Sequence, residues 1–176
     1  MTRKELMKLM PANAQDAAAA EQVVQLGFPA VEPVLRDMVQ AMRVANSPAA
    51  DVFAAFIARL GVPAIPAIAK GLHRENCWLR HRIFTQVLPQ WPLEAIAPLK
   101  IELSCIATQP DAYDNDLLSM ELLLRHHLAD PAWLAQWLDF KQERWTVRDA
   151  ALRRVEAMLK IDRPGAVALH LRLRIR

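Results

Sequence analysis

The stretch LGFPAVEPVL (residues 26–35) recurs as LGVPAIPAIA (residues 60–69), 34 positions further along the chain. A weaker copy, QWPLEAIAPL (residues 90–99), follows 29 positions later, with Pro92 aligned to Pro63. In the two close copies glycine suits the left-handed position after a helix, and proline opens the next helix. A helix pair that recurs every ~30–40 residues is typical of an α-solenoid.

Proline and capping residues mark where the helices begin. Ser47-Pro48 and Asp130-Pro131 each place a capping side chain before a proline at the first helical position. Asn76 is expected to cap the helix after it, and Thr146 to Asp149 has the spacing of a capping box. The predicted helices cover residues 14–26, 30–43, 48–60, 63–73, 77–88, 92–107, 114–128, 131–140 and 146–160.

These signals predict an all-α fold: a short α-solenoid of antiparallel helical hairpins, an alpha-alpha superhelix, in one domain over residues 1–176. A chain of this length buries a sizeable core without a disulfide or metal. The expected units are the repeats 14–43, 48–73, 77–107 and 114–140, the last helix 146–160 and a basic tail 161–176.

The turn pattern L-G-x-P-A-[VI]-x-x-[VI] resembles HEAT repeats. Residues 9–126 are similar to a small bacterial HEAT-like domain family of unknown function, through the stretches LMPANAQDAAAAEQVVQLGFPAVEPVL, VANSPAADVFAAFIARLG and ENCWLRHRIF. The resemblance covers about two-thirds of the chain and rests on structural positions, so it implies a fold and no activity. Ser47 stands where that family often has tryptophan, and residues 129–176 lie outside the resemblance.

Composition and charge indicate a soluble, cytoplasmic protein. Apolar residues make up 53% and charged residues 23%, which argues against disorder. The N-terminal segment is charged and lacks a signal peptide's apolar stretch, and the most apolar segment (52–69) is interrupted by Gly61 and two prolines, so no membrane span is expected. Cys77 and Cys105 are interpreted as small buried side chains in a reducing compartment.

No motif for catalysis is visible, and we expect no enzyme activity and no cofactor. His73, Cys77 and His81 would align as metal ligands on one helix, but a turn before Asn76 separates them, so no metal is expected. The acids of QPDAYDNDLL are interpreted as charges at a helix start, with a contact patch for a basic partner as the alternative. These acids are Asp111, Asp114 and Asp116.

The basic end of the chain is the predicted working surface. Residues 141–176 carry 10 basic and 4 acidic groups, and residues 71–140 carry 5 and 9. Tryptophan beside arginine is typical of interface centres, although core packing is the plainer interpretation of the five tryptophans. In the tail, apolar and basic residues alternate as in an extended strand. The predicted partner-binding residues are Arg144, Trp145, Arg148, Arg172 and Arg174.

Two functions remain open at the level of sequence. The first is a module that binds another protein on the face lined by the second helix of each hairpin; by analogy with small bacterial solenoids, it would be an immunity or inhibitor protein that occludes its partner. The alternative is nucleic-acid binding through the basic C-terminal third. An enzyme on a HEAT-like scaffold is the third possibility, and the lack of a catalytic grouping disfavours it.

Overall fold

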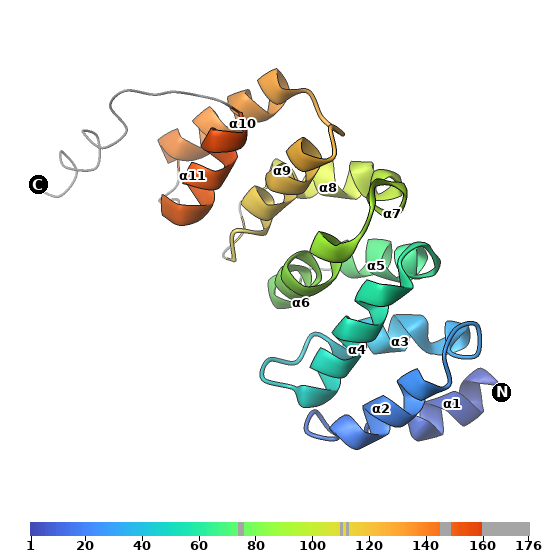
Figure 1. Ribbon diagram of the computed structural model, residues 1–176. Coiled ribbons are helices and arrows are strands. Elements are labelled where there is room, and N and C mark those ends of the chain that lie inside the picture. Colours follow the sequence, from blue (N-terminus) through green and yellow to red (C-terminus); the bar gives the residue numbers. More distant parts are fainter. Residues whose placement is uncertain (74–75, 110, 112, 145–148, 160–176) are drawn as a thin grey trace, which may run out of the picture.

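The chain folds into helices joined by short turns (Figure 1). This computed structural model describes residues 1–73, 76–109, 111, 113–144 and 149–159, with the side chains of 142–144 and 149–153 left out. No strand occurs within these residues, so the all-α class expected from the sequence is confirmed. The basic segment 161–176, with its predicted extended tail, lies wholly outside the described residues.

Most of the helices are short. The α-helices are α1 (Arg3–Leu9), α2 (Ala17–Gln25), α3 (Leu35–Ala41), α4 (Pro48–Leu60), α5 (Ile65–Leu72), α6 (Cys77–Arg82), α7 (Leu93–Ile96), α8 (Lys100–Ala107), α9 (Asn115–Arg125), α10 (Pro131–Arg144) and α11 (Asp149–Met158). Between them lie the 3-10 turns η1 (Glu32–Val34), η2 (Val62–Ala64), η4 (Leu88–Gln90) and η5 (Ala97–Leu99), and the π-helical segment η3 (Ile83–Val87).

The expected caps hold the starts of three helices. Ser47 Oγ accepts the Ala50 N–H at 3.1 Å and starts α4, with Pro48 in the first helical position. Asn76 Oδ1 accepts the Leu79 N–H at 2.9 Å at the start of α6. Asp130 accepts the Ala132 N–H at 2.9 Å before α10. These three capping predictions are confirmed, whereas Thr146 lies outside the described residues.

The two close copies of the turn share a glycine with positive φ. Gly27 has φ 67° and Gly61 has φ 66°. The ψ of Gly61 is −127°, so this residue has an extended backbone with positive φ, a conformation that glycine adopts readily and other residues do not. The left-handed helical conformation that the sequence predicts for Gly61 is therefore wrong. Beyond the glycines the copies differ, because the Phe28–Pro29 peptide is cis while η2 begins directly at Val62.

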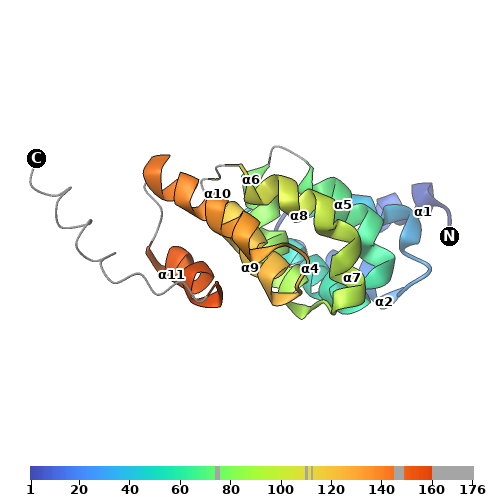
Figure 2. The ribbon, with the colours of Figure 1, turned by 90° about the horizontal axis from the view of Figure 1, so that it is seen from above.

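Helices of successive hairpins pack against their counterparts. Among the first helices, α2 contacts α4, α4 contacts η3, η3 contacts α9 and α9 contacts α11. Among the second helices, α3 contacts α5, and α5 contacts η5 ahead of α8. The helices therefore follow one another along one axis, with α1 and α11 at opposite ends in both views (Figures 1 and 2).

The core runs along this axis between the two sets of helices. In α4, Phe53 and Ile57 are fully buried, because this helix is covered by α2, α3 and η3. Burial of one such side chain contributes about 1.5–3 kcal/mol to stability. An apolar stripe of α9 is also buried, with Leu117 and Met120 at 2% and 0% exposure.

No single helix in the described part of the chain is long and apolar enough to cross a membrane. One pair, Pro48–Leu60 with Val62–Leu72, meets the criteria of length and composition when joined, but is bent by 120°.

Candidate functional site

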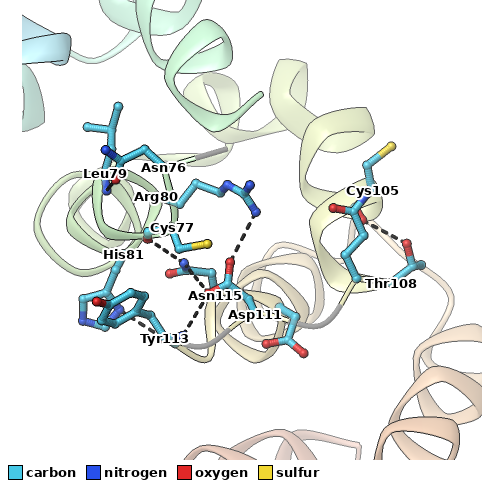
Figure 3. A network of polar contacts seen from close by, with 12 residues as sticks. Asn76, Cys77, Leu79, Arg80, His81, Cys105, Thr108, Asp111, Tyr113 and Asn115 are labelled. Carbon is cyan, nitrogen blue, oxygen red and sulfur yellow. Dashed lines mark hydrogen bonds and ion pairs between the residues drawn. The ribbon is translucent and has the colours of Figure 1, made fainter. Parts of the chain in front are cut away.

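A network of polar side chains surrounds Asp111, ahead of α9 (Figure 3). The Asp111 carboxylate, whose side chain is 1% exposed, accepts the Tyr113 N–H and the Asn115 Nδ2 amide, both at 2.9 Å. Arg80 Nη1 of α6 lies 3.3 Å from its other oxygen. A buried carboxylate is costly unless it is paired and hydrogen-bonded, and these contacts meet that need.

The same network joins α6 to α9. Asn115 Nδ2 also donates to the carbonyl of Cys77 at 2.9 Å, and His81 Nδ1 lies 3.2 Å from the carbonyl of Tyr113. The rings of Trp78, His81 and Tyr113 contact one another, with centroids 5.5–5.9 Å apart. These contacts hold α6 against the start of α9, which is a structural role.

The cysteine in this network is poorly suited to nucleophilic chemistry. Burial and the nearby Asp111 carboxylate raise the pKa of the Cys77 thiol, so that the neutral thiol is favoured. Cys105 is an exposed free cysteine on α8, which corrects its interpretation as a buried side chain. Cys77 is half-buried at the start of α6.

A second buried ion pair joins α9 to α10. Lys141, which is fully buried, places Nζ 2.5 Å from Asp116 Oδ2 and 2.9 Å from the carbonyl of Gln109. Burial raises the pKa of the Asp116 carboxyl, and Lys141 opposes this shift. Asp116 lies in the first turn of α9 and Asp114 directly precedes that helix, as the sequence predicts. The interpretation as charges at a helix start is incomplete, however, because Asp111 and Asp116 also form buried ion pairs.

The partner-binding residues predicted from the sequence lie almost wholly outside the described part of the chain. Trp145, Arg148, Arg172 and Arg174 fall outside it, and Arg144 ends α10 without a described side chain. Of the other tryptophans, Trp91 is 3% exposed, as core packing predicts. The half-buried ones are Trp78, Trp133 and Trp137.

The three potential metal ligands lie on two helices. His73 caps the end of α5, whereas Cys77 opens α6 and His81 follows one turn later, so the break predicted between the first two is present. No group of three His, Cys, Asp or Glu side chains able to hold a metal ion occurs among the residues the structure describes.

The second helices α3, α5 and α8 carry a distinctive set of charges. Arg36, Lys70 and Lys100 are exposed, and none of them forms an ion pair with another described residue. The acids on the same helices do have basic neighbours: Asp37 pairs with Arg3 at 2.9 Å, and Glu102 lies 3.4 Å from His73. On these three helices the charges without a described ion-pair partner are therefore all positive.

No family model, curated protein or solved structure matches this chain. The candidate site therefore rests on geometry and charge alone. The sequence pattern points to Asp111 and Asp116, but not to Arg80, Asn115 and Lys141. No local pattern identifies those partners, since Arg80 lies 31 residues from Asp111 and Lys141 lies 25 residues from Asp116.

Proposed function

We propose that this chain is a protein-binding helical-repeat module, a short α-solenoid of HEAT-like hairpins. The observation that carries the proposal is the order of helix contacts, in which first helices pack on first helices and α3 packs on α5. Such stacking places the apolar faces in the joints between hairpins and leaves a long surface for a partner.

The proposed partner is a protein with an acidic surface. Arg36, Lys70 and Lys100 supply cations on the second helices that have no ion pair with a described residue. The basic C-terminal third would extend this surface, with Trp145 as an apolar anchor at its centre. Positive charge of this kind speeds the encounter with an acidic partner and orients it.

The proposal includes no enzymatic activity. A catalytic site requires a nucleophile or base held by neighbouring groups and open to substrate. The carboxylates of Asp111 and Asp116 are instead occupied by ion pairs within the fold. An immunity or inhibitor role, in which binding alone blocks the partner, fits a chain of this kind.

The same cations also favour a second candidate, nucleic-acid binding. A phosphate backbone would contact Arg36, Lys70 and Lys100 without regard to sequence, and its affinity would fall steeply as salt increases. A protein partner would keep part of its affinity at high salt, because buried aromatic contacts are not screened.

Capture by the tagged full-length chain from native lysate, with and without nuclease, tests the proposal. We expect one protein to be retained after nuclease treatment, and to be lost when Arg144, Arg148, Arg172 and Arg174 are changed to alanine together. A matched variant, Lys4, Lys8, Glu21 and Glu94 to alanine, changes as many exposed charges away from α3, α5, α8 and the C-terminal third, and should retain it. Recovery of nucleic acid alone would contradict the proposal. Capture of the protein in equal amount by the folded variant that lacks the four arginines would also contradict it.

A further inference from the structure

A groove of about 500 Å³ opens on the edge of the molecule where the turns inside the hairpins lie. One wall is the end of α4 and the turn through Gly61 and Val62; the other is the turn from Gln90 to Glu94. Trp91, 3% exposed, joins the walls by donating its Nε1–H to the Ala58 carbonyl at 3.1 Å. The groove is therefore a fixed feature of the fold.

The walls of this groove present apolar side chains to solvent. Val62 on the first wall is 51% exposed, and Leu93, beside the second, is 50% exposed. The preceding hairpin turn adds Phe28 at 44% and Leu26 at 39%. Large exposed apolar side chains that recur in successive hairpin turns are consistent with a contact surface, whereas a single one would need no explanation.

One cation and one anion line the groove from opposite walls. Arg59, at the end of α4, and Glu94, at the start of α7, are both exposed. Neither forms an ion pair with a described residue. A strongly acidic or strongly basic partner would meet one of these charges with like sign, so the groove favours a partner that presents one charge of each sign around an apolar centre.

We propose that this edge is a self-association surface, whose occupant is the same edge of a second copy of this chain. A two-fold axis that runs along the groove brings each wall of one copy against the opposite wall of the other copy. Arg59 then meets Glu94 of the second copy, and the reverse pair forms by symmetry, while Val62 contacts Leu93 between them. This inference does not rest on the proposed function, because it leaves α3, α5 and α8 free.

Sedimentation velocity of the purified full chain over a concentration series into the high micromolar range tests the inference. We expect a reversible monomer–dimer equilibrium. Arg59→Glu and Glu94→Arg should each raise the dimer dissociation constant at least about tenfold, because each reversal opposes like charges twice. The double variant with both changes should restore it to near the wild-type value.

Two further variants complete the design. Leu93→Glu should also weaken the dimer, since it places a charge in the apolar centre of the interface. It provides a second test of the interface if either charge reversal impairs folding. Lys70→Glu, the same change of charge on α5, should leave the dimer unchanged. A wild-type chain that stays monomeric overturns the inference. A double variant with both Arg59→Glu and Glu94→Arg that is folded but does not restore association also overturns it.

Discussion

The change Lys141→Met removes the cation that the buried Asp116 carboxylate requires. Lys141 Nζ is fully buried and bonds to Asp116 and to the carbonyl of Gln109. Removal of one partner from a buried ion pair costs about 3–5 kcal/mol, because the other charge stays in a site of low polarity. The freed carbonyl adds about 1 kcal/mol if water does not reach it. We therefore expect a loss of about 4 kcal/mol in the free energy of unfolding.

This loss should depend on pH in a direction that the structure defines. Burial raises the pKa of Asp116, and without Lys141 only the backbone hydrogen bonds of Asp116 and Leu117 still oppose this shift. A carboxyl whose pKa is higher in the folded than in the unfolded state destabilises the fold once pH exceeds the unfolded value. The loss in Lys141→Met should therefore be smallest near pH 4 and grow as pH rises through the raised pKa.

Urea unfolding followed by circular dichroism at pH 4.5 and pH 8 measures this loss. The free energy of unfolding is obtained by treating the chain as a small domain that unfolds in a single two-state transition. The double variant Asp116→Leu/Lys141→Met removes both charges and should recover most of the stability. Arg125→Met breaks the exposed pair with Glu121 and should cost at most about 0.5 kcal/mol. Equal losses in Lys141→Met and Arg125→Met, or a double variant as unstable as the single one, would refute the reasoning.

Further predictions concern the glycines, the cysteines and metal. Gly61→Val should lower stability by about 1 kcal/mol through its positive φ alone, since a Cβ there meets no atom within 4 Å; an unchanged melting temperature would contradict this. Gly71→Ala should cost about 1–3 kcal/mol in the same unfolding assay, because its Cβ would lie 3.0 Å from Ile83 and Val39 side chains. A thiol reagent at pH 7.5 should label exposed Cys105 faster than Cys77; the reverse order in single-cysteine variants would contradict the raised pKa of Cys77. Elemental analysis should find no stoichiometric zinc, and one zinc per chain that is lost in His81→Ala would overturn this prediction.

The sequence predicts the helices well because their starts are set locally. A capping side chain and a following proline act within one turn, so Ser47 and Asp130 identify the starts of α4 and α10 without tertiary information. Helix α1 is absent from the predicted helices, although Thr2 and Glu5 form a complete capping box whose spacing is visible in the sequence.

The polar joints could not be predicted in the same way. Arg80 and Asp111 come together only because α6 packs against α9, and Asp116 meets Lys141 only because the chain brings the end of α10 back to the start of α9. A charge pattern read along the chain treats such acids as solvated, since it carries no information about burial. The self-association groove has the same origin, since its two walls come from different hairpins.

We propose above all that the second helices and the basic C-terminal third bind an acidic protein. Hydrogen exchange of the chain, alone and with the protein captured from lysate, tests it most directly. We predict slower exchange on binding in α3, α5 and α8 and after residue 140, with α2 and α4 unchanged. Protection confined to the first helices or to the edge around Trp91, or no change in exchange anywhere, would contradict the claim.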